Sequence, residues 1–159
     1  MANVFHSQAD MSIDLHRMKS KTSLWAVPIG RTLFSLIFIL SGINHFSSGS
    51  ISYAAEQGIP MADILVPVSG LLALIGGLSV FLGYHARMGA TLLLLFLVPV
   101  TVLMHNFWSY TDPELAQVQM IHFMKNLSLI GASILILFYG AGPLSLDHRR
   151  GKYTKGKRT

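Results

Sequence analysis

The sequence has no cysteine among its 159 residues. This absence excludes disulfides, thiolate metal ligands, a redox dithiol and a cysteine nucleophile. Any electron transfer by the chain must therefore depend on a bound cofactor. The sequence also lacks a glycine-rich phosphate loop, a Ser-His-Asp order and paired carboxylates inside an apolar run. It therefore carries no flavin or nucleotide motif and gives hydrolysis no support.

Charged residues are scarce as well. They make up 12% of the chain, whereas a soluble domain carries about 25%. Hydrophobic residues make up 52%, and uncharged residues gather in runs close to the roughly 20 residues that cross a bilayer. The composition therefore predicts an all-α integral membrane protein, a four-helix bundle surrounded by the lipid bilayer.

Four apolar runs predict the four membrane-spanning helices. Their approximate limits are 24–46, 64–83, 88–108 and 119–142. We expect 47–63 to form a loop or a short surface helix, and 109–118 to form a polar loop. The helices make up one domain, 24–147, between a polar N-terminal tail at 1–23 and a basic tail at 148–159.

The placement of lysine and arginine predicts which side each end faces. Both tails and the short link at 84–87 are basic, whereas the other two loops carry acidic residues and no lysine or arginine. By the positive-inside rule, both termini lie in the cytoplasm (N-in/C-in) and the acidic loops face outward. The net charge is +5, and we expect the basic tails to face anionic lipid rather than nucleic acid.

One arginine falls inside an apolar run. Arg31 lies roughly 10 Å inside the first predicted helix, at a rise of 1.5 Å per residue. An arginine at the centre of a membrane helix costs about 2.5 to 3.5 kcal/mol on insertion scales, so its charge needs a partner. Asp147, which follows the fourth helix on the same side, is our candidate for a structural ion pair. A contact from Arg31 to a substrate or a lipid headgroup is the alternative.

Polar residues gather at the predicted outer ends of three helices. A neutral imidazole can donate to or accept from a quinone carbonyl, and a lysine or an asparagine can stabilise the reduced anion. These residues could also simply meet headgroups and water, or the histidines could ligate a metal or a haem. Quinone is the favoured cofactor and haem the less favoured one; we predict no dedicated metal site and assign no catalytic residue. The ligand-binding candidates are Asn44, His45, His105, Asn106, His122, Lys125 and Asn126.

Several short motifs occur in a recognisable order over about residues 28–147. They are Gly30-Arg31, Ser41-Gly42-Ile43-Asn44-His45-Phe46, Gly58-Ile59-Pro60, Gly76-Gly77, Leu82-Gly83, Arg87, Met104-His105-Asn106-Phe107-Trp108, Phe123-Met124-Lys125-Asn126 and Gly142-Pro143-Leu144-Ser145-Leu146-Asp147. In this order and spacing the sequence resembles the DoxX family, also called DoxX-like or DoxD-like, of small four-helix bacterial membrane proteins.

The resemblance implies a multi-pass protein of the bacterial inner membrane that serves as a subunit of a quinol oxidase or another oxidoreductase. Relatives of the family occur in thiosulfate:quinone oxidoreductase and in complexes that answer oxidative stress. Many members carry a glutamate in the second helix before the glycine pair, whereas this chain has Ser69 in that stretch. The departure removes a proton carrier from any mechanism carried over from the family.

Residues and resemblance together predict the membrane subunit of a quinone-linked oxidoreductase complex, with other subunits or further copies of the chain as partners. Two other classes stay open. The first is a noncatalytic scaffold that anchors soluble redox enzymes through the basic tail Arg149 to Arg158. The second, less favoured, is a small-solute carrier, because no acid occupies the bilayer centre to couple transport.

Overall fold

The structure is a computed structural model that describes residues 24–149, and in this range it is helical without strands. The two predicted tails, 1–23 and all of 148–159 beyond Arg149, lie outside the described residues. The elements are a first helix at Leu24–Asn44, α2 at Ser48–Glu56, α3 at Ala62–Leu82, α4 at Ala86–Met104, a 3-10 turn at Phe107–Ser109 and α5 at Pro113–Tyr139.

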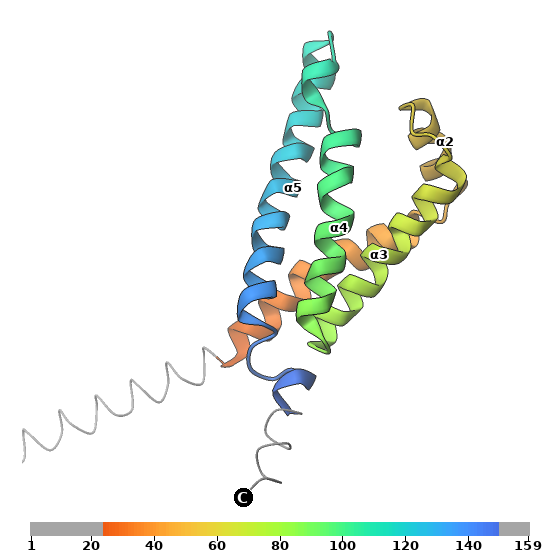
Figure 1. The fold of residues 1–159 in the computed structure, drawn as a ribbon. Helices are drawn as coiled ribbons and strands as arrows, with labels where there is room; N and C mark the ends of the chain where they lie inside the picture. The colour runs from red at the N-terminus through yellow and green to blue at the C-terminus, as the bar shows by residue number, and fades with distance from the viewer. Residues whose placement is uncertain (1–23, 150–159) are drawn as a thin grey trace, which may run out of the picture.

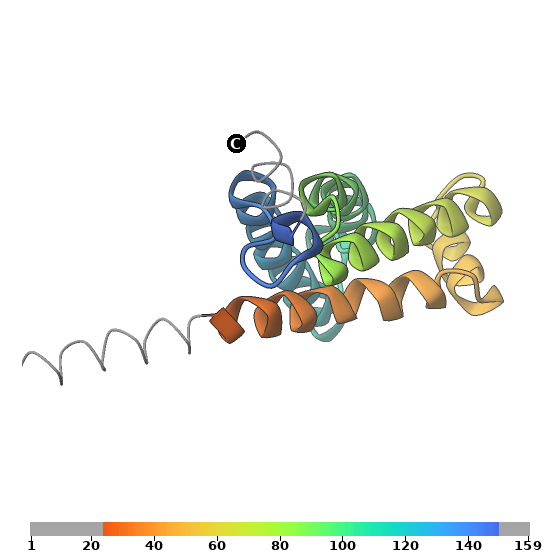
Figure 2. The ribbon, with the colours of Figure 1, turned by 90° about the horizontal axis from the view of Figure 1, so that it is seen from below.

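The long helices form two pairs. Figure 1 shows α4 and α5 side by side, while α3 leans away from α4 as it approaches α2. Seen from below in Figure 2, the first helix runs beside α3 and crosses the α4–α5 pair. The N-terminal pair is therefore inclined to the C-terminal pair, and the two pairs diverge on the side where α2 lies.

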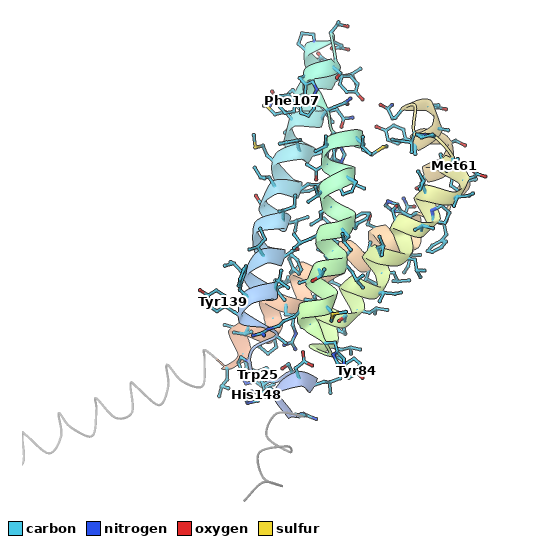
Figure 3. The ribbon with its side chains drawn as sticks, viewed as in Figure 1. Trp25, Met61, Tyr84, Phe107, Tyr139 and His148 are labelled. Atoms are coloured by element: carbon cyan, nitrogen blue, oxygen red, sulfur yellow. The ribbon has the colours of Figure 1, made fainter. Side chains whose placement is uncertain are left out.

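Four helices of the described part are long and apolar enough to cross a membrane. Their outward faces carry many exposed leucine, isoleucine and valine side chains. Such a continuous apolar surface is unfavourable in water and favourable in the hydrocarbon of a bilayer. Exposed aromatic residues lie at one end of the bundle, where Figure 3 labels Trp25, Tyr84 and Tyr139, and such rings prefer the membrane–water interface. The predicted all-α multi-pass membrane fold is confirmed.

Glycines let the helices approach closely. A Cβ added to Gly70 of α3 would lie 2.5 Å from Cβ of His45 and 2.9 Å from the carbonyl oxygen of Gly42 in the first helix. A Cβ on Gly76 of α3 would lie 2.9 Å from the carbonyl oxygen of Gly89 in α4. Small residues give this backbone approach its room, which lipid-embedded helices need because no hydrophobic effect drives them together.

The limits of two helices differ from the predicted ones. Helix α5 begins at Pro113 rather than at about 119, because Asp112 accepts a hydrogen bond from the Glu114 amide and a proline suits the first turn. Helix α4 ends at Met104 rather than at 108, since His105 leaves helical geometry at φ −125°, ψ 39°. The stretch 47–63 contains the surface helix α2, capped by the Ser47 side chain.

Candidate functional site

A cavity of about 470 Å³ lies where the two helix pairs diverge. Its walls come from the first helix, α2, α3, α4 and α5, and most of them are apolar. Its deeper part is formed by large apolar side chains such as Phe38, Leu72 and Phe96. The volume and the apolar lining with a few polar groups are typical of a small-molecule site.

The structure brings four of the seven predicted ligand-binding residues to this cavity. We call the end of the bundle that carries His45, His105 and His122 the histidine end. The cavity-lining members of the predicted set are His45, His105, Lys125 and Asn126. The remaining three, Asn44, Asn106 and His122, lie at the same end but do not line the cavity.

Asn126 is the most unusual of the four. This residue is 5% exposed and lines the cavity from α5. No hydrogen bond joins its amide to another described residue, although an asparagine side chain offers two N–H donors and one acceptor oxygen. Since no enclosed side-chain nitrogen or oxygen among the described residues lacks a partner, the amide atoms themselves keep surface open to the cavity. This amide is therefore available to a ligand in the cavity.

His45 is held by the helix that it terminates. Its Nδ1 lies 2.6 Å from the carbonyl oxygen of Ser41, which can only accept. The neutral ring must therefore carry its proton on Nδ1, which leaves the lone pair on Nε2 as an acceptor. The ring also stands edge-on to Phe96, with centroids 5.5 Å apart. Glycine at position 70 makes room for this histidine, as described above.

His105 takes part in a hydrogen-bonded link between three helices. Its Nδ1 lies 2.8 Å from Oε1 of Gln119, and Nε2 of Gln119 donates to the Tyr53 hydroxyl at 3.5 Å. The link joins the end of α4 to α5 and α2, and Tyr53 lines the cavity. Gln119 is 9% exposed. Our sequence analysis missed it, although it shares a helix face with His122 and Asn126 at spacings of three and seven.

His122 supports the site from outside the cavity. Its ring stacks on that of His105, with centroids 5.2 Å apart and an interplanar angle of 29°. The Lys125 ammonium lies 3.4 Å from His122 Nδ1, and because an ammonium can only donate, the imidazole accepts there. Lys125 thus joins the cavity lining to the stacked pair. No group of three His, Asp or Glu side chains suited to a metal ion occurs within residues 24–149.

The opposite end of the bundle, which we call the arginine end, carries Arg31 and Asp147. The Arg31 guanidinium donates to the carbonyl oxygens of Phe81 at 3.2 Å, Ala141 at 2.7 Å and Leu144 at 3.2 Å. These carbonyls lie at or just beyond the C-terminal ends of α3 and α5, where orphan acceptors and the negative end of the helix dipole favour a cation.

Asp147 also bonds to main chain. Its two carboxylate oxygens accept from the amides of His85 at 2.8 Å and Ala86 at 3.0 Å, at the start of α4. The two residues predicted as an ion pair thus reach the same end of the bundle, where the Asp147 charge attracts the Arg31 guanidinium, but the hydrogen bonds of each go to helix termini rather than to the other. The physical reason is that three helix ends converge there and leave unsatisfied carbonyls and amides. This arrangement is structural and leaves the histidine end as the candidate site.

Comparisons with known proteins agree with the fold. The model of the DoxX family matches residues 26–106. The inner membrane protein YphA of Escherichia coli is 30% identical over 123 residues, which cover 76% of this chain and 87% of YphA. The inner membrane protein YqjF of the same organism is 27% identical over 128 residues, which cover 79% and 92% of the two chains.

A eukaryotic protein matches as well. The ER-derived vesicles protein ERV29 of Saccharomyces cerevisiae is 27% identical over 128 residues, which cover 77% of this chain but 41% of ERV29. No solved structure matches the chain significantly.

Proposed function

The chain belongs to the DoxX family, and from this membership and the cavity at the histidine end we propose that it is the membrane subunit of a quinone-linked oxidoreductase complex in a bacterial inner membrane. The observation that carries the proposal is the unpartnered amide of Asn126 in an apolar cavity. This amide keeps surface open to the cavity and has no partner in the described protein, so a ligand in the cavity can hydrogen-bond to it.

The chemistry of the lining suits a quinone ring. Its flat, apolar body fits walls such as Phe38 and Leu72, and its carbonyl oxygens accept hydrogen bonds. The Asn126 amide can donate to one carbonyl, and the Lys125 ammonium can stabilise the negative charge that develops on reduction. The Nε2 lone pair of His45 can accept a proton from the bound quinol when it is oxidised.

The chain supplies no electrons of its own. Conversion of a quinone to a quinol consumes two electrons and two protons, and the chain has neither cysteine nor a recognisable cofactor motif. The electrons are therefore exchanged with a redox centre on a partner subunit. In this scheme the chain binds the quinone and moves protons at its carbonyl oxygens.

The proposal is tested by quinone content. The purified protein in phosphatidylcholine nanodiscs should retain added quinone, measured by extraction and absorbance. Asn126→Leu should weaken binding by roughly 2- to 12-fold, the equivalent of one hydrogen bond of about 0.5 to 1.5 kcal/mol. Asn106→Leu is the matched control, since the same residue type lies at the same end outside the cavity. No quinone bound to the wild-type protein, or equal losses in both variants, would refute the proposal.

The orientation of the bundle is part of the proposal. With both termini in the cytoplasm, the histidine end faces the periplasm and the arginine end faces the cytoplasm. A reporter that is active only in the cytoplasm should work when fused to either terminus. Activity of a periplasmic reporter at either terminus would reverse the assignment.

The basic tail Arg149 to Arg158 favours a second candidate, a noncatalytic scaffold that anchors soluble redox enzymes. Deletion of residues 150–159 separates the two candidates. A scaffold should lose its partner proteins on purification, whereas a quinone subunit should keep its bound quinone.

A further inference from the structure

Exposed lining residues of the cavity gather on α3 and α4. Five of its lining residues on α3 and α4 are exposed, and all are apolar: Leu65 and Val68 on α3, and Leu95, Pro99 and Leu103 on α4. Figure 1 shows α3 leaning away from α4 in this region. The opening between the two helices therefore lies on an apolar face of the membrane-spanning part.

The position of this opening along the helices decides whether it faces water or lipid. Both helices are candidate membrane spans, and the rim residues fall within them: Leu65 and Val68 in Ala62–Leu82, and Leu95 and Leu103 in Ala86–Ser109. A rim without a charged side chain at this depth faces hydrocarbon rather than water.

The cavity itself is polar at one end only. His45, Ser50 and Tyr53 line it at the histidine end, whereas Leu72 and Leu97 line its deeper part. A ligand that fills it must place hydrogen-bonding groups toward the histidine end and apolar groups toward the bilayer centre or out through the flank. An amphiphile with a polar head and a long apolar tail meets both conditions.

We propose that the gap between α3 and α4 is a lateral portal, rimmed by Leu65, Val68, Leu95 and Leu103, through which the cavity takes a tailed quinone directly from the lipid phase. The ring lies against the polar end of the cavity, and the tail leaves between α3 and α4 into the bilayer. This inference rests on the proposed quinone function and narrows it to membrane-dissolved quinones rather than water-soluble ones.

Bulky residues on the rim test the portal. Val68→Trp and Leu103→Trp should each lower the retention of a decyl-tailed benzoquinone in nanodiscs at least tenfold. They should change the retention of the same ring without a tail less than twofold, because that ring can also enter from water. The matched controls are Val98→Trp and Leu127→Trp, since these residues are 49% and 51% exposed, against 50% for Val68 and 55% for Leu103, and do not line the cavity.

The outcomes separate the two proposals. Quinone binding that both rim variants leave intact would refute the portal and keep the quinone site. A loss produced by Ile37→Trp instead would move the entrance to the first helix, where Ile37 is an exposed lining residue. Failure of the wild-type protein to bind either quinone, with phospholipid extracted in its place, would refute the quinone function.

A second measurement tests the portal without any quinone. Because the chain has no cysteine, Leu72→Cys gives a single spin label on the cavity wall. A portal to lipid predicts more frequent collisions with oxygen, which concentrates in hydrocarbon, than with a water-soluble nickel chelate. Val68→Trp should reduce the oxygen collisions. More frequent collisions with the nickel chelate would show that the cavity opens to water and would overturn the inference.

Discussion

Replacement of Asn126 by leucine should have opposite effects on stability and on binding. The residue is 5% exposed, and its amide faces the largely apolar cavity without a hydrogen-bond partner in the described part of the chain. An amide that is only partly desolvated bears part of the cost of a buried, unpaired polar group, which is about 1 to 3 kcal/mol on protein mutational scales. Leucine has a similar size and removes this cost, so the ligand-free Asn126→Leu protein should unfold with a free energy higher by up to that amount.

The same change should reduce the stabilisation that the ligand provides. A ligand at 100 times its dissociation constant stabilises a protein by about 2.7 kcal/mol. If Asn126→Leu weakens binding tenfold, the same ligand concentration corresponds to 10 dissociation constants and gives about 1.4 kcal/mol. The ligand-induced shift in melting temperature should therefore fall by about half, while the melting temperature without ligand rises.

The assay is thermal unfolding in nanodiscs with and without a decyl-tailed benzoquinone. Asn106→Leu provides the baseline for an asparagine outside the cavity. A lower melting temperature of ligand-free Asn126→Leu would mean that the amide is already satisfied, for example by water in the cavity, and the reasoning would fail. An unchanged ligand-induced shift would show that Asn126 does not contact the ligand.

Other predictions concern packing and the hydrogen bonds at the helix ends. Gly70→Ala should lower the free energy of unfolding by about 1 to 3 kcal/mol through overpacking, and the melting temperature with it, because the added Cβ would lie 2.5 Å from Cβ of His45. Gly30→Ala, with nothing within 4 Å, should be neutral or stabilising. Arg31→Met should destabilise by several kcal/mol through the loss of three carbonyl bonds, and the exchange Arg31→Asp with Asp147→Arg should not rescue it in thermal unfolding. Gln119→Leu should lower the free energy of local opening of α2, measured by hydrogen exchange, by roughly the 0.5 to 1.5 kcal/mol of a hydrogen bond.

The helix ends show where sequence reading fell short. The span of α5 was predicted to begin at about 119, because residues 113–118 are polar, yet Asp112 and Pro113 start a helix there. A polar segment and a polar helix extension look alike in hydropathy, and only the capping signal tells them apart. Hydropathy alone therefore places Gln119 at the edge of a span, whereas in the structure it is a packed part of the helix.

The arginine end shows a different limit. The sequence indicated that Arg31 needs a partner, since a charge in an apolar run is costly. It could not indicate which partner, because the carbonyls of Phe81, Ala141 and Leu144 exist in every sequence and become acceptors only where helix ends meet. The sequence offered Asp147 as a partner for Arg31, because this acid lies near the same depth. In the structure the Asp147 carboxylate accepts hydrogen bonds from the amides of His85 and Ala86.

By itself, the sequence determined the class of this protein and the approximate positions of its four membrane helices. The reason is energetic, because hydrocarbon excludes charge over about 20 residues and this exclusion can be read along the chain. Only the tertiary structure decided which polar residues share a cavity, separating Asn126 from Asn44 and Asn106. That choice depends on the inclination of one helix pair to the other, which follows from close contacts between the pairs, such as Gly76 of α3 with Gly89 of α4.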